Sequence, residues 1–311
     1  MPDTSQPIDL MPAPPRRHPE WIRVRAPFGE EYTRLKGLVR TLELNTVCSE
    51  ALCPNIGECW GAGTLTIMIL GDTCTRACRF CAVNTGNPRG IVDVDEPRRV
   101  GEAIAELNLN YVVITSVDRD DLPDGGAGIF AQTVREIQEH SPRTIVEVLT
   151  PDFSGDASLM KKIVDAKPEV IAQNIETVKR LTYTVRDRRA GYEQTLSILR
   201  AVKEMDPTRK TKTSLLLGFG ETTDEVLETM RDLRAHDVDL LAIGQYLRPT
   251  DKRRHYPLVE YVHPDVFKML KAEGMKMGFT YIASGPLVRS SYKAYEAAML
   301  FTQPENIADA E

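Results

Sequence analysis

The sequence predicts an α/β fold: a partial (β/α)6 barrel of the TIM type, with an N-terminal cysteine-bearing extension and a C-terminal extension. The first observation behind this prediction is that short apolar runs recur through the middle of the chain. The second is that segments with the apolar spacing of a helix separate these runs, and repeated strand–helix units form parallel sheets. The third is the length of 311 residues, which is enough to bury one such core.

The elements are predicted in order along the chain. Apolar spacing predicts a helix between Trp21 and Leu44, and a cysteine-bearing loop with short helical turns follows it because Pro54 and Gly57 interrupt any regular element. The predicted strands are the six apolar runs 64–70, 111–117, 144–150, 169–175, 212–218 and 239–247. Helices are predicted at 98–108, 128–139, 159–165, 192–205, 223–236 and 264–274, and residues 279–285 add a short extended piece.

We expect four regions along the chain. Residues 1–20 are rich in proline and form a flexible leader, and residues 21–63 form the extension that carries three of the cysteines. Residues 64–260 form the barrel, and residues 261–311 form the C-terminal extension. In barrels of this type the chemistry takes place at the carboxyl ends of the strands. The cysteine loop that follows the first strand is therefore expected on that face.

The composition argues against several classes of function. A net charge of −6 gives no overall basic field to attract nucleic acid. No apolar run approaches the length of a membrane span, so no membrane contact is expected. The leader lacks the apolar core of a signal peptide, and Asp3 and Asp9 make it a poor transit peptide. We therefore expect a cytoplasmic protein.

All six cysteines lie between Cys48 and Cys81. Disulfides that stabilise a chain of this size would be spread along it, and without an export signal the compartment is expected to be reducing. The clustering therefore indicates metal binding.

Cys74, Cys78 and Cys81 stand at a C-x3-C-x2-C spacing. A loop of this length can direct three thiolates to one iron–sulfur cluster and leave one iron open, unlike the fully ligated clusters of bacterial ferredoxins. The spacing resembles the signature of the radical S-adenosylmethionine (SAM) enzymes. That resemblance implies that the open iron binds SAM and that an electron from the cluster releases a 5′-deoxyadenosyl radical.

Cys48, Cys53 and Cys59 stand at C-x4-C-x5-C, which is no structural zinc pattern, and a second three-ligand cluster is the simpler interpretation. Together with the RSSY motif (289–292) and the stretches PNIGECW, TRACRFC, DRDDLPDGG, GFGET and QYLRP, this spacing resembles the lipoyl synthases from Trp21 to about Tyr295. The resemblance implies two [4Fe-4S] clusters. It also implies that Ser290 is the fourth ligand of the auxiliary cluster, with Ser291 as a lesser candidate.

The resemblance implies a sulfurtransferase that inserts two sulfur atoms at carbons 6 and 8 of a protein-bound octanoyl-lysine, with the auxiliary cluster as sulfur donor. Those methylenes carry no activating group, so hydrogen abstraction by a radical is the workable route. A serine oxygen is poorly matched to an iron–sulfur cluster and would dissociate readily, which suits a cluster that gives up sulfur.

The partners implied by the resemblance are octanoylated lipoyl carrier domains, such as the glycine cleavage H protein and 2-oxoacid dehydrogenase acyltransferases. A reductant such as flavodoxin or ferredoxin and a cluster-rebuilding carrier are also implied. The basic runs 186–189 and 252–255 are hypothetical docking sites for an acidic carrier, although such runs are usually solvated faces.

Several residues are candidates for SAM contacts, each with a structural alternative. Glycines at the end of a strand allow a ligand to approach the backbone, although a plain strand-to-helix turn has the same pattern. Polar side chains at strand ends could hold the ribose or amino acid portion, and could equally cap helices. An aromatic residue beside the last cysteine could pack on adenine or only on the loop. The candidates are Phe80, Thr115, Asn174, Glu176, Gly218, Gly220 and Glu221.

Other interpretations of the chain remain open. The acidic stretch 118–126 is interpreted as an ordered loop over the active face, because its spacing fits no calcium loop and Arg119 lies among its carboxylates. The alternative functions are a biotin-synthase-like sulfur insertion on another substrate, an iron–sulfur electron-transfer module and, more remotely, a zinc-stabilised nucleic-acid binder.

Overall fold

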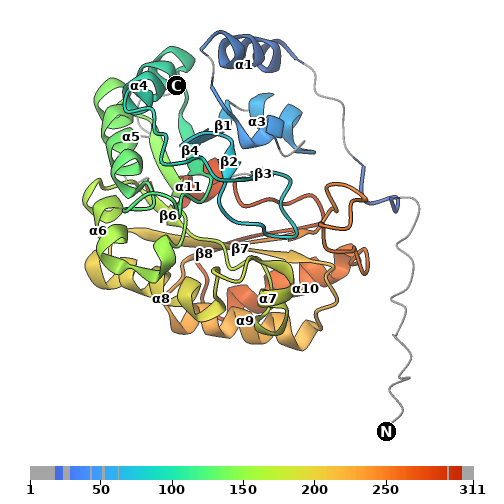
Figure 1. Ribbon diagram of the computed structural model, residues 1–311. Helices are drawn as coiled ribbons and strands as arrows, with labels where there is room; N and C mark the ends of the chain where they lie inside the picture. Colours follow the sequence, from blue (N-terminus) through green and yellow to red (C-terminus); the bar gives the residue numbers. More distant parts are fainter. Residues whose placement is uncertain are drawn as a thin grey trace, which may run out of the picture.

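The computed structural model describes residues 18–23, 29–42, 44–50, 53–61, 63–292 and 294–302. Its centre is a parallel sheet of seven strands in the order β1-β4-β5-β6-β7-β8-β9, and this sheet curves into an incomplete barrel (Figure 1). The strands are β1 (Thr64–Ile69), β4 (Tyr111–Ser116), β5 (Ile145–Leu149), β6 (Val170–Ala172), β7 (Lys210–Leu217), β8 (Leu240–Gln245) and β9 (Tyr281–Ser284). The predicted α/β barrel is confirmed, and the extended piece at 279–285 contributes a seventh strand to it.

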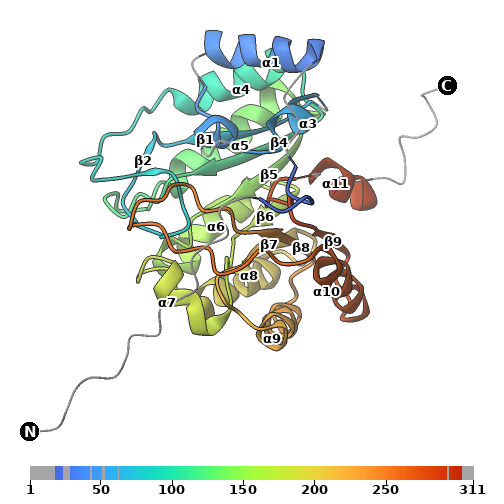
Figure 2. The ribbon, with the colours of Figure 1, turned by 90° about the vertical axis from the view of Figure 1, so that its right-hand side faces the viewer.

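Helices cover the outer face of the sheet (Figures 1 and 2). They are α4 (Glu96–Leu107), α5 (Ala127–His140), α6 (Ala157–Asp165), α8 (Tyr192–Met205), α9 (Thr223–Ala235) and α10 (Pro264–Lys276). Local signals set some of their ends. Thr222 and Glu225 form a capping box at the start of α9. Pro264 begins α10, a position at which a backbone N–H would make no hydrogen bond within the helix, so proline is tolerated there.

Short elements lie in the connections of the barrel. They are β2 (Thr73–Cys74), β3 (Asn84–Thr85), η1 (Phe153–Gly155), η2 (Lys179–Leu181) and α7 (Thr182–Val185). β2 and β3 pair with one another and bracket the cysteine loop.

Strands β1 and β9 are the two edges of the sheet, and segments from both ends of the chain lie between them. The N-terminal segment contains α1 (Glu30–Thr41), α2 (Val47–Glu50) and α3 (Ile56–Gly61). Thr46 forms an antiparallel bridge to Ile67 of β1. The Asn55 side chain donates to the carbonyl oxygen of Leu287 at 2.6 Å, so the two terminal segments also bind one another.

The last described helix, α11 (Ala294–Thr302), packs against the inner side of the sheet. Ala294 and Ala298 form a small core cluster with Tyr111 and Val113 of β4. Figure 2 shows α11 at the end of the barrel remote from the cysteine loop. No helix was predicted at this position.

The barrel interior also holds a buried polar group beside this cluster. Lys212 Nζ donates to both carboxylate oxygens of Glu147 at 2.9 and 2.7 Å, and the Tyr111 hydroxyl donates to Glu147 Oε2 at 2.5 Å. Glu147 is 1% exposed and Lys212 is 5% exposed, so each charge depends on the other for its partner.

The predicted leader lies outside the described residues apart from its end. At that end, the His18 ring contacts Tyr261, with Nδ1 2.9 Å from the hydroxyl oxygen. Just after the leader, the centre of the Trp21 ring lies 5.2 Å from that of the His263 ring. No helix in the described ranges is long and apolar enough to cross a bilayer.

Candidate active site

The first cysteine group lies on the loop after β1, at the carboxyl end of the barrel, as predicted. Cys74 belongs to β2, and the Cys81 N–H donates to the carbonyl oxygen of Cys78 at 3.2 Å, which closes the turn between the last two cysteines. All six cysteines of the chain are free of disulfides and described.

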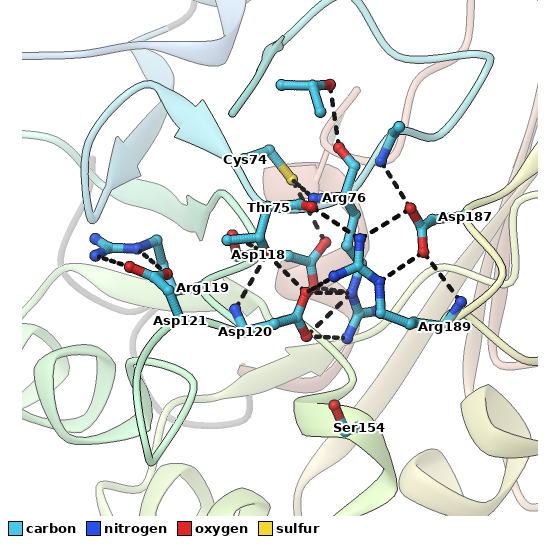
Figure 3. A network of polar contacts seen from close by, with 12 residues as sticks. Cys74, Thr75, Arg76, Asp118, Arg119, Asp120, Asp121, Ser154, Asp187 and Arg189 are labelled. Carbon is cyan, nitrogen blue, oxygen red and sulfur yellow. Dashed lines mark hydrogen bonds and ion pairs between the residues drawn. The ribbon is translucent and has the colours of Figure 1, made fainter. Parts of the chain in front are cut away.

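Arg76, between the first two cysteines, is the centre of a polar network (Figure 3). Its guanidinium donates to both carboxylate oxygens of Asp152 at 2.8 Å, and Nη2 donates to Asp120 Oδ1 at 2.9 Å. Nε lies 3.3 Å from Asp118 Oδ1. Arg76 is only 4% exposed, so three carboxylates from two other loops hold the cysteine loop from inside.

Residues 118–121 hold two loops at once. The Thr75 N–H and hydroxyl donate to the carbonyl oxygen of Asp118, each at 3.0 Å. Arg119 forms an ion pair with Asp121 and donates to the carbonyl oxygens of Leu70 and Ile91. The predicted ordered loop over the active face is thus the support of the cysteine loop.

The outer side of the cysteine loop is covered by residues 254–256. The Arg79 N–H donates to the carbonyl oxygen of Val185, and the Tyr256 N–H donates to that of Arg79. Arg254 Nη2 donates to the carbonyl oxygen of Ala82 at 3.3 Å, and His255 Nε2 lies 3.1 Å from that of Cys81.

The residues of the two basic runs differ in their bonds to the rest of the protein. Arg186 is buried and donates to the carbonyl oxygen of Ile175 and to Thr195 Oγ1, while Arg254 is exposed and donates to the cysteine loop. Arg188, Lys252 and Arg253 remain exposed beside them.

Burial governs the electrostatics of the three sulfurs. It raises the pKa of Cys74 and of Cys78 to about 12, and it raises the pKa of Cys81. Burial likewise raises the pKa of Asp118 to about 6, against the lowering effect of Arg76. Thiols in this environment stay protonated by themselves, and a positively charged metal centre is what converts buried thiols to thiolates.

Two of the strand-end candidates carry polar atoms suited to a ligand. Asn174 Oδ1 is buried and has no hydrogen-bond partner among the described residues, and the same holds for the neighbouring Gln173 Oε1. Glu176 adopts a positive φ of 66°, and burial raises the pKa of its carboxyl group. The charge of Glu176 adds to the effect of burial in raising the pKa of Cys81. Unsatisfied buried acceptors of this kind fit a polar cofactor beside the cysteine loop.

The remaining candidates have partners inside the protein. Glu221 accepts from the N–H groups of Gly218 and Phe219 at 2.5 and 2.9 Å, so its carboxylate closes the turn at the end of β7. Thr115 Oγ1 donates to the carbonyl oxygen of Leu149 at 3.0 Å. Phe80 is partly buried and packs against the apolar core formed by residues between Ile175 and Ile282. Gly220 lies in the same turn, with a φ of 95°.

The second cysteine group surrounds a hollow with about 300 Å³ of free space, part of it open to solvent. In the described chain, no three His, Cys, Asp or Glu side chains are arranged to bind one metal ion, and the sulfurs border this space instead. Burial raises the pKa of Cys53, while the adjacent Arg289 acts in the opposite direction. The lining consists of Cys48, Cys53, Asn55, Ile56, Cys59, Thr64, Thr66, Arg289, Ser291 and Tyr292.

The two serines of the RSSY motif point to different places. Ser291 lines the hollow with the three cysteines, and its Oγ accepts from Thr66 Oγ1 at 3.0 Å. Ser290, the serine favoured by the sequence, lines a separate small hollow beside Lys212 and Tyr281. Residues 289–292 form a turn, closed by the Tyr292 N–H that donates to the carbonyl oxygen of Arg289 at 2.9 Å, and in this turn the two serines face different hollows.

Comparison with known proteins agrees with this geometry. The model of the radical SAM superfamily matches residues 68–233, and that of the N-terminal domain of lipoyl synthase of the radical SAM family matches residues 9–53. Lipoyl synthase of Thermus thermophilus is 59% identical over 288 residues, which cover 93% of this chain and 88% of that protein. The chain belongs to the lipoyl synthase family.

Other lipoyl synthases show the same likeness. The protein of Deinococcus radiodurans is 52% identical, over 94% of this chain and 87% of its own length. The apicoplast lipoyl synthase of Plasmodium knowlesi is 54% identical over 92% of this chain, which spans 64% of that longer protein. As a radical SAM enzyme of this family, the protein requires a [4Fe-4S] cluster and SAM, and lipoyl synthases act on octanoylated carrier proteins.

Solved structures agree on the fold alone. Methylornithine synthase superposes with a TM-score of 0.52 at 13% identity, over 82% of each chain. Streptococcus suis SuiB bound to S-adenosylmethionine gives 0.54 at 12% identity, over 81% of this chain and 60% of that one. The partial barrel is thus shared with these two proteins of distant sequence.

Proposed function

We propose that this lipoyl synthase family member inserts two sulfur atoms, at carbons 6 and 8 of a protein-bound octanoyl-lysine, and so forms the lipoyl group. The observation that supports this most directly is the hollow in which three cysteines meet a serine of the RSSY motif, at the edge of a barrel with its own cysteine loop. Generation of a radical from SAM requires only the first set of sulfur ligands, so the second set is available for a separate task such as sulfur donation.

The first group, Cys74, Cys78 and Cys81, would hold the cluster that binds SAM. Asn174 and Glu176 would contact the polar part of SAM, because they provide buried polar groups beside this loop. Gly218 and Gly220 would allow the adenosyl part to approach the backbone, with Glu221 fixing their turn. Thr115 and Phe80 are weaker candidates for the same site, since each has a partner inside the protein.

The second group, Cys48, Cys53 and Cys59, would hold the auxiliary cluster, and we assign its oxygen ligand to Ser291 in place of Ser290. Ser291 Oγ accepts a hydrogen bond from Thr66, so its own proton can leave when the oxygen binds a metal. When bound, SAM at the first cysteine group would supply the carbon radical that abstracts hydrogen from unactivated methylenes, and the auxiliary cluster would supply the sulfur that replaces it. Arg289 beside Cys53 adds a positive charge that favours the thiolate.

Octanoylated carrier domains, such as the H protein and the 2-oxoacid dehydrogenase acyltransferases, would dock on the exposed basic residues Arg188, Lys252 and Arg253. The other arginines of these runs hold the protein together, so they are unsuitable for a docking test. Reversal of the charges at Lys252 and Arg253 should weaken carrier binding and reduce its salt dependence. Unchanged affinity would exclude this surface. A flavodoxin or ferredoxin reductant, a cluster-rebuilding carrier and a cytoplasmic location complete the proposal.

The decisive experiment is anaerobic reconstitution, followed by iron and sulfide counts and incubation with SAM, reductant and an octanoyl-lysine peptide. We expect the wild type to form the lipoyl product. Cys78→Ala should hold half of the iron and form no 5′-deoxyadenosine. Ser291→Ala should still cleave SAM but lose sulfur insertion, whereas Ser290→Ala should retain it.

Two results would contradict the proposal, and a third would contradict only the assignment of the oxygen ligand. A fully loaded wild type with a single cluster would remove the sulfur donor. Labelled sulfide that enters the product from solution and not from the protein would do the same. Sulfur insertion by Ser291→Ala at the wild-type rate would remove only the assignment of the oxygen ligand.

A further inference from the structure

Asp187, two residues after α7, contacts the cysteine loop at two points. Its carboxylate Oδ2 accepts from the Ala77 N–H at 2.9 Å, and its own N–H donates to Cys78 Sγ at 3.2 Å. One residue therefore holds both the backbone before Cys78 and the sulfur of Cys78. Figure 3 shows Asp187 beside Arg189, which also contacts Asp120.

Arg189 fixes Asp187 in this position. Its N–H and Nε donate to Asp187 Oδ1 at 3.0 and 2.8 Å, and Nη2 donates to Oδ2 at 3.0 Å. Nη2 also donates to the carbonyl oxygen of Thr75 at 2.8 Å. The Asp187 side chain is 10% exposed, so little solvent competes for these bonds.

An N–H group that donates to a cysteine sulfur changes the properties of a metal cluster on that sulfur. It withdraws negative charge from the thiolate and stabilises the state with one more electron. Such partners outside the ligand set also fix the orientation of the ligand. The geometry of residue 187 therefore bears directly on electron uptake at the first cysteine group.

We propose that Asp187 is a positioning residue that sets the reduction potential of the cluster held by Cys74, Cys78 and Cys81. Its carboxylate, bound to Ala77 N–H, keeps its own N–H directed at Cys78 Sγ. This inference rests on the proposed role of these three cysteines. It assigns to the segment after α7 a role in electron uptake that is separate from SAM binding.

The chain offers a matched control in Asp121. Like Asp187, it forms a forked ion pair with an arginine two residues away, Arg119, and it accepts from a distant backbone N–H, that of Gly90, at 2.7 Å. Gly90 lies outside the cysteine loop. Substitution of Asp121 removes the same kinds of bonds with no direct effect on a sulfur.

The test compares alanine with asparagine at each position in the reconstituted full-length protein. Both substitutions remove the carboxylate charge, and only asparagine keeps an oxygen that can accept the backbone N–H. The measurement is an anaerobic redox titration followed by electron paramagnetic resonance, in which the signal that changes on addition of SAM identifies this cluster. Thermal unfolding and iron counts accompany each variant.

We expect the potential of Asp187→Ala to be more negative than that of Asp187→Asn, and the potentials of Asp121→Ala and Asp121→Asn to coincide. If Asp187→Ala loses the SAM-responsive signal and half of the iron, the comparison is made between Asp187→Asn and Asp187→Ser at full iron content, and the variant with the weaker acceptor, Asp187→Ser, should have the more negative potential. Equal potentials for Asp187→Ala and Asp187→Asn at full iron content would overturn it, as would equal loss of stability in the Asp187 and Asp121 variants with no change in potential. A wild type without any SAM-responsive signal would instead count against the proposed function.

Discussion

At the scale of single residues, the pair formed by Lys212 and Glu147 shows what a buried charge requires. Removal of one partner leaves the other charge in the barrel interior without compensation. We expect Lys212→Met to lower the free energy of unfolding by about 3–5 kcal/mol. Urea unfolding of the two proteins measures this difference.

The control for this prediction removes both charges. In a double variant, Glu147→Leu with Lys212→Met, no charge is left unpaired, so it should be more stable than Lys212→Met alone. The Tyr111 hydroxyl keeps its acceptor, Glu147, in Lys212→Met and loses it only in the double variant, so both proteins should also carry Tyr111→Phe. A double variant less stable than the single one would show that the pair stabilises the barrel in its own right.

At the residue level, the sequence predicts groups of ligands more readily than it distinguishes neighbouring residues. Spacing is enough to recognise two cysteine triads, because thiol ligands occur in few patterns. The two adjacent serines cannot be separated in this way, since only the path of the backbone decides which hydroxyl faces the hollow. Arg76 was likewise missed, and the carboxylates of the 118–126 loop on either side of Arg119 were a signal that a buried cation needed partners.

At the scale of elements, the turn between β7 and α9 depends on glycine. Gly218 has a φ of 112°, and a Cβ there would lie 2.3 Å from Gln245 Nε2 and 2.7 Å from the carbonyl oxygen of Glu260. Gly218→Ala combines backbone strain with overpacking, so we expect it to cost about 2 kcal/mol or more of stability. Gly220→Ala should cost less, because the nearest atom, of Val259, is 3.5 Å away. Equal losses in thermal unfolding would contradict this account.

The start of α4 supplies a prediction of pH dependence. Glu96, its first residue, accepts from the Leu70 N–H at 2.9 Å, and burial raises the pKa of its carboxyl group above the ordinary 4.5. The folded state then holds the proton more strongly than the unfolded state, so the stability due to Glu96 is present at low pH and is lost as the pH rises above 4.5. We expect Glu96→Gln, which keeps the acceptor, to be more stable than the wild type at pH 7.

The comparison must then be repeated across the pH range. The advantage of Glu96→Gln should shrink as the pH falls toward 4, where Glu96 takes up its proton. Denaturant unfolding at several pH values measures it. An advantage that is independent of pH would mean that side-chain packing, and not charge, distinguishes the two proteins.

Most elements of the barrel could be predicted from the sequence. Buried parallel strands are continuous apolar runs, and the runs at 64–70 and 111–117 coincide with β1 and β4 to within one residue at each end. Helix α11 was missed, because its alanines meet their partner, β4, across more than 170 residues of chain. Only the three-dimensional structure shows that the C-terminal extension packs against the inner side of the sheet.

At the scale of the whole molecule, the segments that carry the two cysteine groups differ in the bonds that hold them to the rest of the protein. Residues 74–78 are held by arginine and aspartate side chains, whereas the described residues 44–50 and 53–61 contact the barrel and the C-terminal segment through bonds such as those of Asn45, Thr46 and Asn55, without ion pairs of that kind. We expect anaerobic removal of iron to increase hydrogen exchange in 44–61 and 285–292 far more than in 74–78. Mass spectrometry of the reconstituted and iron-free proteins measures this, and the barrel strands are the internal control. Equal increases in all three segments would contradict the difference in support.

Strand β1 has a consequence for how both cysteine groups can be used. Cys59 precedes its first residue, Thr64, by five positions, and Cys74 follows its last residue, Ile69, by five. This buried strand is about 20 Å long at about 3.3 Å per residue, and its rigidity fixes the distance between its two ends. A molecule that visits both ends must supply the reach itself, which favours a long, pliable acyl arm over a compact, stiff substrate.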